Sequence, residues 1–421
     1  MSLLLGAVAD DFTGATDLAN TLVQQGMRVT QLIGVPDENT DIGDAQAVVI
    51  ALKSRMAPPE DAVEWSLQAI KWLQERSTHQ FFFKYCSTFD STAQGNIGPV
   101  GDAMHEYLGS DITVICPAFP DNGRTIYKGN LFVNEVLLSE SPMRNHPLTP
   151  MRDSNLIRIM DAQSKLKTHG VDLNVVRQGS AAILCEMNSL RTNGYSYCVV
   201  DATNNEDLDA LGAALADHVF VTGGSAVARG LPTNYRKAGM LGDPELPVLP
   251  KTKGRSIVLA GSCSVATRAQ IALVSDLWPV FKIDVNALAD GTLSTVMITD
   301  WVLNQDPKKP VLIYASADPD EVAETQGKYG VEKAGKLVED VMGQTAFALS
   351  KAGVGKFVVA GGETSGAVVE ALKIKGLRIG PEIDPGVPWT ESIGETPVAL
   401  ALKSGNFGAD DFFVKALDML G

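Results

Sequence analysis

Short apolar runs rich in Val and Ile alternate with longer segments whose apolar residues recur at helical spacing, and this alternation restricts the possible folds most. Strands are expected at 3–9, 46–52, 112–116, 197–202, 219–222, 256–260, 311–315, 356–360 and 397–402. Helices are expected at 14–26, 60–76, 155–169, 205–217, 331–352, 364–373 and 410–420. Strands that are apolar along their whole length are typical of parallel sheets covered on both faces by helices. The pattern therefore predicts an α/β protein with mainly parallel sheets.

The alternation stops at residues 239–254, GMLGDPELPVLPKTKG, and resumes after them. Proline and glycine without sustained periodicity indicate a linker between domains. We therefore expect two α/β domains, residues 1–242 and 255–421, joined by a linker at 243–254. A cleft between two domains is a common place for a small-molecule site, so an interdomain active-site cleft is expected.

The composition excludes several classes of protein. The chain has 35 Lys and Arg against 50 Asp and Glu, a formal net charge of −15, which disfavours binding to a nucleic-acid backbone. The first apolar run ends at Ala9, too short for a secretory signal, and no run approaches the roughly 20 apolar residues of a membrane helix. The five cysteines and five histidines show no disulfide or metal-ligand spacing. A cytoplasmic protein without nucleic-acid or membrane partners is expected.

Two adjacent aspartates, Asp10 and Asp11, follow the first predicted strand in the sequence ADDFTGATD. Ligands of open α/β sheets lie beyond the carboxyl ends of the strands, so both carboxylates are well placed to bind one. Neighbouring residues point in different directions, which suits one for binding hydroxyl groups and the other for capping a helix opened by Gly14. The alternative is that Asp11 and Thr13 are only helix-capping residues. These residues alone leave both interpretations open.

A second polar cluster, KYCSTFDST at 84–92, follows the apolar run 81–83 and continues to Gly95 and Asn96. A lysine, an aspartate and several hydroxyl groups are suited to a polyhydroxy acid, because the cation pairs with its carboxylate and the aspartate accepts from its hydroxyls. Ser and Thr also form ordinary turns, which is the structural alternative. The predicted substrate-binding residues are Asp10, Arg55, Lys84, Asp90, Ser91 and Thr92.

Glycine-bearing turns follow several predicted strands of the second domain. Gly361 and Gly362 lie between a strand and a helix, where free backbone N–H groups and the helix dipole favour a phosphate. Similar turns occur at 260–264 and 403–408. None matches the G-x-x-x-x-G-K-[ST] or G-x-G-x-x-G pattern, and each alone is equally consistent with tight packing. Together they predict a nucleotide site.

These motifs together resemble the four-carbon acid sugar kinase family over essentially the whole chain. The resemblance rests on V-A-D-D-F-T-G-A (Val8 to Ala15), D-S-T-x-x-G-N (Asp90 to Asn96), A-G-G-E-T-S-G (Ala360 to Gly366) and K-S-G-N-F-G (Lys403 to Gly408). It implies an N-terminal domain that binds the acid sugar and a C-terminal domain that binds ATP. The implied nucleotide-binding residues are Ser262, Ala360, Gly361, Gly362, Glu363 and Gly405.

The stretch from Tyr85 to Asn96 is similar to the 3-oxo-tetronate kinase branch of that family. Phe89 and Gln94 stand where many other members have Lys and Arg, so no cationic role transfers to these two positions. The resemblance implies an ATP- and Mg²⁺-dependent transfer of phosphate to the terminal hydroxyl of 3-oxo-tetronate. Threonate or erythronate is the alternative substrate. Asp11 is expected to accept the hydroxyl proton, although the sequence does not distinguish it from Asp10.

Two other functional classes are compatible with a sugar-acid site. A non-catalytic sensor usually adds a signal peptide or a basic helix-turn-helix, and the sequence shows neither. A dehydrogenase is disfavoured because G-x-G-x-x-G is missing. We therefore expect a kinase whose partners are a sugar acid and ATP, with a homodimer as a possible assembly.

Overall fold

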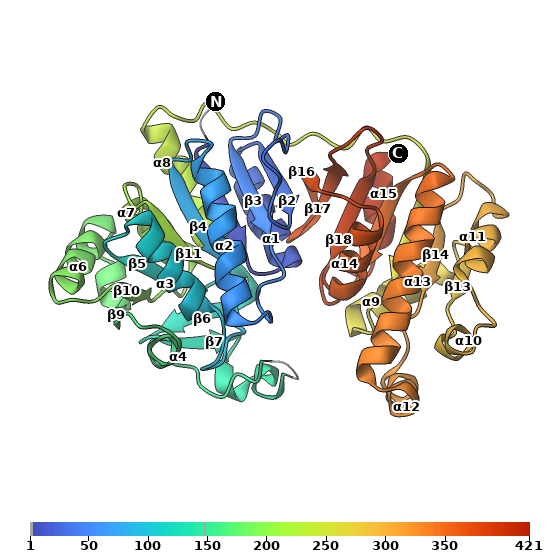
Figure 1. The fold of residues 1–421 in the computed structure, drawn as a ribbon, viewed down its shortest axis with the longest axis horizontal. Helices are drawn as coiled ribbons and strands as arrows, with labels where there is room; N and C mark the ends of the chain where they lie inside the picture. Colours follow the sequence, from blue (N-terminus) through green and yellow to red (C-terminus); the bar gives the residue numbers. More distant parts are fainter. Residues whose placement is uncertain (1–2, 147–148) are drawn as a thin grey trace. The chain divides into compact units, whose positions relative to one another are not determined.

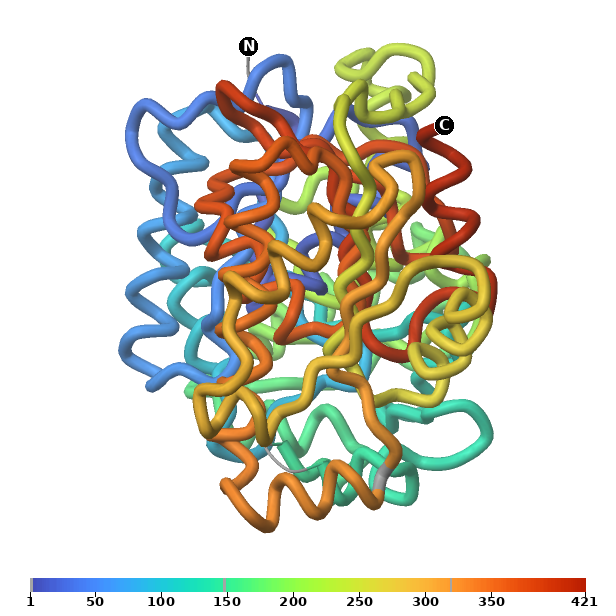
Figure 2. The backbone as a smooth tube through the Cα atoms, turned by 90° about the vertical axis from the view of Figure 1, so that its right-hand side faces the viewer, coloured from blue at the N-terminus to red at the C-terminus, as the bar shows by residue number. Residues whose placement is uncertain are grey.

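The computed structural model describes residues 3–146 and 149–421, which belong to two compact units, Met1–Leu246 and Pro247–Gly421 (Figure 1). The boundary lies within the Pro- and Gly-rich segment 239–254. Figure 2 traces the same backbone, in which the first unit runs from blue to yellow-green and the second from yellow to red. Both units are α/β structures with mainly parallel sheets, which confirms the fold class predicted from the alternation.

The described strand pairs of the first unit's main sheet are all parallel. Its strands lie in the order β2 (Val29–Ile33), β3 (Ala47–Ala51), β1 (Leu5–Ala9), β4 (Gln80–Lys84), β11 (Phe220–Gly223), β5 (Thr113–Cys116), β10 (Tyr197–Val200) and β9 (Thr168–Val171). In the register of this sheet, Ala9 lies beside Ala51 on one side and Lys84 on the other. The carboxyl ends of β3, β1 and β4 are therefore neighbours.

The helices of the first unit cover both faces of this sheet. They are α1 (Phe12–Gln24), α2 (Pro59–Gln74), α3 (Ile97–Leu108), α4 (Leu156–Gln163), α5 (Leu173–Val176), α6 (Ser180–Thr192), α7 (Asn205–Ala214) and α8 (Leu231–Lys237), with the 3₁₀ turns η1 (Pro120–Asn122), η2 (Leu138–Glu140), η3 (Pro142–Asn145) and η4 (Ser225–Gly230). From β1 the chain crosses through α1 towards β2, whereas from β3 it crosses back through α2 to β4. Because such crossovers are right-handed, α1 and α2 cover opposite faces.

The predicted helix at 155–169 is wrong in its second half. Helix α4 ends at Gln163, and residues 168–171 form β9. Asp102 of α3 ends the helix: its carboxylate accepts from Ser164 Oγ at 2.6 Å and from the Lys165 backbone N–H at 2.8 Å. Before α4, the chain forms an antiparallel sheet of β6 (Arg124–Tyr127), β7 (Asn130–Val133) and β8 (Val136–Leu137), which the sequence analysis did not predict.

The second unit's sheet is parallel except at one edge. Its order is β13 (Val280–Lys282), β14 (Val311–Tyr314), β12 (Arg255–Ala260), β15 (Val354–Ala360), β18 (Ala399–Lys403), β17 (Val387–Ser392) and β16 (Gly376–Asp384), with β17 antiparallel to both neighbours. The helices are α9 (Val265–Ser275), α10 (Val285–Ala289), α11 (Thr295–Leu303), α12 (Pro319–Tyr329), α13 (Val331–Lys351), α14 (Gly362–Ala371) and α15 (Phe412–Leu420). Trp389, buried in the core, donates from Nε1 to the Ala416 carbonyl at 2.9 Å, which joins α15 to the sheet.

Among the described residues, no helix is both long enough and apolar enough to cross a membrane.

Candidate active site

Asp10 and Asp11 lie between β1 and α1, where the chain turns from strand to helix. Asp11 is the N-cap of α1, so the helix begins two residues before Gly14. Its carboxylate accepts from Thr13 Oγ1 and from the Gly14 backbone N–H, both at 3.0 Å. The capping interpretation of Asp11 and Thr13 is therefore correct as local structure. It does not exclude a role in chemistry, because 28% of the Asp11 side chain remains exposed, against 5% for Asp10.

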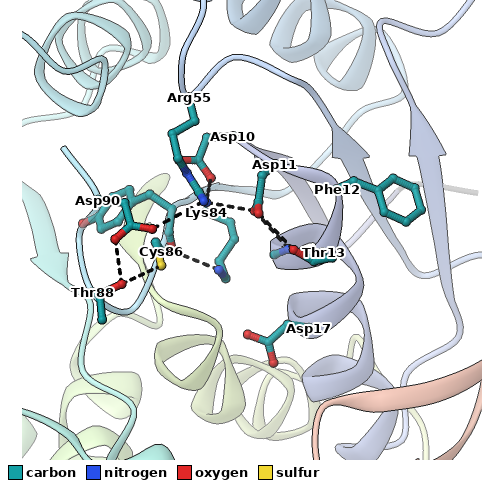
Figure 3. Close-up of polar contacts among 12 residues, drawn as sticks. Asp10, Asp11, Phe12, Thr13, Asp17, Arg55, Lys84, Cys86, Thr88 and Asp90 are labelled. Carbon is teal, nitrogen blue, oxygen red and sulfur yellow. Dashed lines mark hydrogen bonds and ion pairs between the residues drawn. The ribbon is translucent and has the colours of Figure 1, made fainter. Parts of the chain in front are cut away.

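Arg55 joins these carboxylates (Figure 3). It follows β3, the neighbour of β1, and its guanidinium donates to both Asp10 oxygens, from Nε at 2.9 Å and from Nη2 at 2.8 Å. The same Nη2 lies 2.9 Å from Asp11 Oδ1, and Nη1 lies 3.6 Å from Asp90 Oδ2. A planar guanidinium offers donors in several directions, so one arginine can organise three carboxylates.

The loop that carries Arg55 is held by Asn96, the last residue of the D-S-T-x-x-G-N motif. Its Nδ2 donates to the carbonyl oxygens of Ser54, Arg55 and Ala57 at 2.8, 3.2 and 2.8 Å. The Asp10 carbonyl accepts from the backbone N–H groups of Ser54 and Arg55. These contacts fix the backbone at Arg55. Asn96 therefore positions Arg55 and has no need to contact a ligand.

Lys84 ends β4 on the other side of β1, and it is buried. Its Nζ donates to the Tyr85 carbonyl at 2.8 Å. A Cβ added at Gly14 would lie 3.1 Å from this Nζ and 2.2 Å from Asp11 Oδ1. Glycine is therefore required at position 14, because the lysine and the aspartate both approach the first turn of α1 closely.

The two adjacent aspartates differ in their electrostatics. Burial raises the pKa of Asp10, and its pairing with Arg55 only partly offsets this effect. Burial acts in the same direction on Asp11, but the charges of Arg55 and Lys84 and the hydrogen bonds from Thr13 and Gly14 outweigh it and lower the pKa of Asp11. Asp11 is therefore ionised at neutral pH and partly exposed, whereas Asp10 is buried with both oxygens bonded to Arg55.

Asp90 is presented by a strained turn. Phe89 and Asp90 both have left-handed backbone angles, with φ of 65° and 40°, which cost free energy in residues other than glycine. The Phe89 ring is fully buried and packs edge-on against Tyr85 at 5.4 Å between ring centroids, which anchors the turn. Thr88 Oγ1 donates to Asp90 Oδ1 at 2.7 Å and lies 3.0 Å from Cys86 Sγ. Burial raises the pKa of the Cys86 thiol to about 12, so it is protonated.

Ser91 and Thr92 make contacts that hold the loop itself. Ser91 Oγ accepts from Gln163 Nε2 at 2.9 Å, and the Thr92 carbonyl accepts from the same amide. Gln163 Oε1 accepts from the Gly98 backbone N–H at 2.9 Å. The structure thus brings together Asp10, Asp11, Arg55, Lys84 and Asp90. The Ser91 hydroxyl instead bonds to Gln163 of α4.

In the second unit, the predicted glycine turns lie at the carboxyl ends of the adjacent parallel strands β12, β15 and β18. The Gly361 backbone has φ of 129°, and a Cβ there would lie 2.9 Å from Thr364 Oγ1 and 3.2 Å from the Ser262 backbone nitrogen. A Cβ at Gly405 would lie 2.2 Å from Ser262 Oγ. The hydroxyl groups of Ser262 and Thr364 come this close, which explains glycine at 361 and 405.

Gly362 is the first residue of α14, and a Cβ added there would meet nothing within 4 Å. The neighbouring Glu363 is exposed in the first turn of the helix. The first N–H groups of a helix have no intrahelical partner and attract anions. The open space at Gly362, the free helix start and the turns at Ser262 and Gly405 suit the phosphates of a nucleotide.

Within the described ranges, no group of three or more His, Cys, Asp or Glu side chains is arranged to hold a metal ion. Asp10, Asp11 and Asp90 do not form such a group, and each of them contacts the Arg55 guanidinium.

Comparison with known proteins assigns both units to described domain families. Residues 5–231 match a family described as a sugar-binding N-terminal domain, and residues 257–413 match one described as a nucleotide-binding C-terminal domain. The 3-oxo-tetronate kinase of Pseudomonas fluorescens is 52% identical, over 99% of this chain and 97% of its own length. The chain belongs to the four-carbon acid sugar kinase family, in its 3-oxo-tetronate kinase branch.

Further proteins are similar to this chain in sequence and in fold. The 3-oxo-tetronate kinase of Burkholderia multivorans is 53% identical, over 99% of this chain and 97% of its own length. A solved structure of a Haemophilus influenzae protein has a TM-score of 0.85 and 45% identity, covering 99% of this chain and 100% of that chain. The resemblance stated from the motifs is therefore confirmed at the level of family and branch.

The sequence did not reveal several residues of this kinase that hold the loops of the site in place. Asn96 was noted only as part of a motif, and Gln163 lies 72 positions from Ser91, its partner. Lys403 was noted as part of a turn, although the structure places its ammonium under that turn. The one available signal for Lys403 was its position at the end of an apolar strand, which it shares with Lys84.

Proposed function

We propose that the protein is an ATP-dependent kinase that phosphorylates the terminal hydroxyl of 3-oxo-tetronate, giving 3-oxo-tetronate 4-phosphate. The observation that supports this most is the cluster of Asp11, Asp90, Arg55 and Lys84 at the carboxyl ends of adjacent strands. A four-carbon sugar acid has one carboxylate and several hydroxyls. The cluster offers cations for the former and carboxylate oxygens for the latter.

Asp11 is the proposed proton acceptor. It is ionised and partly exposed, and its position is fixed by Thr13, the Gly14 N–H and Arg55. A lowered pKa makes it a weak base, which suits phosphoryl transfer, because the hydroxyl proton leaves late when the transition state is loose. Asp11 then mainly orients the hydroxyl, and it takes the proton as the new P–O bond forms.

Asp10 is proposed to act on the substrate through Arg55. Both of its oxygens bond to the guanidinium, so it keeps Arg55 directed towards Asp11 and Asp90. A direct contact between Asp10 and a substrate hydroxyl remains a prediction, as do the contacts of Lys84, Ser91 and Thr92. Lys84, buried beside Asp11, is suited to neutralise an anionic group that approaches the start of α1.

ATP is proposed to bind at the glycine turns of the second unit, with Ser262, Ala360 to Glu363 and Gly405 around its phosphates. Mg²⁺ would enter with the nucleotide, bound mainly by phosphate oxygens and water, which is its usual mode in kinases. It would neutralise charge that develops on the phosphates.

Substrate choice is the first test. Phosphorylation rates on a panel of four-carbon acids, with and without a 3-oxo group, should give the highest kcat/KM for a 3-oxo-tetronate. Because Phe89 and Gln94 bring no cation, the site depends on Arg55 and Lys84 for the carboxylate. A higher kcat/KM for threonate or erythronate would assign the protein to the alternative substrate.

Gly362→Val tests the nucleotide site. The new side chain meets no protein atom within 4 Å of its Cβ, so the fold should stay intact, but it occupies the space where phosphate should approach the helix start. We expect the KM for ATP to rise by about tenfold or more, the equivalent of losing one hydrogen bond to a charged group. The KM for the sugar acid should stay the same.

Gly366→Val is the matched control. Gly366 lies one turn further along α14, and a Cβ there also meets nothing within 4 Å. It lies beyond the free N–H groups of the helix start, so ATP kinetics should not change. Equal effects of the two substitutions would mean that the nucleotide does not bind at Gly362.

A further inference from the structure

Lys403, the last residue of β18, has a buried ammonium group on the interior side of the turn that contains Gly405. The residue is fully buried, so its side chain does not reach the surface of the turn. Its Nζ donates to the carbonyl oxygens of Ser404 at 3.1 Å and Gly405 at 2.9 Å, and to Thr267 Oγ1 of α9 at 3.0 Å.

The Gly405 carbonyl is the centre of these contacts. It accepts from Lys403 Nζ, from Ser264 Oγ at 2.6 Å and from Thr267 Oγ1 at 2.8 Å. The C=O and the following N–H of a trans peptide point in opposite directions. A Gly405 carbonyl bonded to Lys403 Nζ therefore directs the Asn406 backbone N–H away from this ammonium group.

The charge of Lys403 has no counterion among its hydrogen-bond partners, which are all neutral oxygens. Thr267 of α9 contacts the ammonium, Ala360 of β15 is the register partner of Lys403, and Ser264 bonds to the same Gly405 carbonyl; none of these side chains titrates.

Two other lysines of the chain, by contrast, lie beside carboxylates. Lys415 of α15 pairs with Asp384 of β16, and the remaining Asp384 oxygen accepts from the Ala409 backbone N–H. Lys84, at the equivalent strand position in the first unit, lies in the field of Asp10 and Asp11. Burial without a counterion lowers the pKa of Lys403 to about 8. A buried charge of this kind is costly unless an anion compensates it.

We propose that Lys403 is a positioning residue of the nucleotide site, which holds the 404–406 turn from the interior and supplies a positive charge that the nucleotide's phosphates compensate. The proposal rests on the proposed binding of ATP at this turn. Lys403 acts through the Gly405 backbone and through the electric field of its own charge, without touching the nucleotide.

The test is MgADP binding by calorimetry to the wild type, to Lys403→Met and to the control Lys356→Met. Lys356 belongs to β15 of the same sheet and donates to the Gly421 carbonyl at the end of the chain. We expect Lys403→Met to weaken MgADP binding by about tenfold, the equivalent of one pKa unit. Lys356→Met should leave MgADP binding unchanged.

The melting temperature of the nucleotide-free protein separates this role from simple packing. Methionine removes the cost of burying an uncompensated charge, so at pH 7 Lys403→Met should melt at the same temperature as the wild type or higher. A residue that only supports the fold would give a lower melting temperature and unchanged affinity per folded molecule. That outcome would overturn the proposal.

The pH dependence gives a second measurement that does not need the variant to fold. If phosphate binding restores the charged ammonium, wild-type affinity for MgADP should fall by about tenfold between pH 7 and pH 9, with net proton uptake on binding at pH 8.5. Affinity that is independent of pH in the wild type overturns the proposal. If MgADP does not bind the wild type at any pH, the proposed ATP site itself is wrong.

Discussion

Asp11→Asn should lower kcat by about 10²–10⁴-fold, the usual contribution of a positioned acid–base group. The amide keeps the shape of the side chain, but it cannot accept a proton at neutral pH. Because Asp11 is ionised and partly exposed, whereas Asp10 is buried against Arg55, the loss should be concentrated in kcat. The measurement is steady-state kinetics with 3-oxo-tetronate, together with MgADP binding, which should match the wild type.

The N-cap role of Asp11 offers a control within the same variant. Asparagine is as good an N-cap as aspartate, so α1 should keep its start and the melting temperature should change little. Asp284→Asn makes the same exchange at the N-cap of α10 and should leave kcat unaltered. If Asp11→Asn instead melts early but turns over normally per folded molecule, Asp11 is only a cap, and the proton acceptor has to be sought at Asp90.

The fold was predictable where hydrophobic pattern alone decides the local structure. The expected strand at 46–52 is β3, Ala47–Ala51, and the expected helix at 331–352 is α13, Val331–Lys351. Strand β2 was overlooked because its sequence, VTQLI, carries polar residues at buried positions. Gln31 is satisfied there by Thr16 Oγ1 at 2.9 Å, a contact from α1 that no local pattern contains.

The site was predictable as a set of residue types but not as a network. Strand ends can be located in the sequence, whereas the order β3-β1-β4, which makes Arg55 and Lys84 neighbours of Asp10, is a property of the sheet. Similarly, the left-handed backbone at Phe89 and Asp90 has no glycine to signal it. It depends on the burial of the Phe89 ring, which is tertiary packing.

Arg55→Met should strongly destabilise the first unit. It leaves Asp10, whose side chain is 5% exposed, without its bidentate partner and beside two further carboxylates. Removal of one member of a buried ion pair typically costs about 3–5 kcal/mol. Native-state hydrogen exchange in β1 and β3 measures the free energy of unfolding of this unit separately from the second. Activity should be lost as well, since Asp11 and Asp90 lose the group that orients them.

Arg158→Met is the matched control, because Arg158 also donates to both oxygens of an aspartate, Asp153, but its side chain is 66% exposed. Exposed ion pairs contribute at most about 1 kcal/mol, so this variant should unfold nearly as the wild type does. The double variant Asp10→Asn/Arg55→Met removes both members of the buried pair and should regain part of the stability, though not the activity. Equal losses of unfolding free energy for Arg55→Met and Arg158→Met would show that the buried pair contributes no more to stability than the exposed one.

The pH dependence of the stability of Arg55→Met identifies which group causes the loss of stability. Burial already raises the pKa of Asp10 above its value of 3.8 in the unfolded chain, and removal of Arg55 takes away the charge that opposes this effect. The folded variant therefore binds a proton at Asp10 that the unfolded chain releases, so its stability should fall as the pH rises through the raised pKa of Asp10. Relative to the wild type, Arg55→Met should be least destabilised in acid and most destabilised at pH 8. A deficit that is constant from pH 5 to pH 8 would mean that Asp10 stays ionised without Arg55, and that the lost stability comes from packing around the guanidinium.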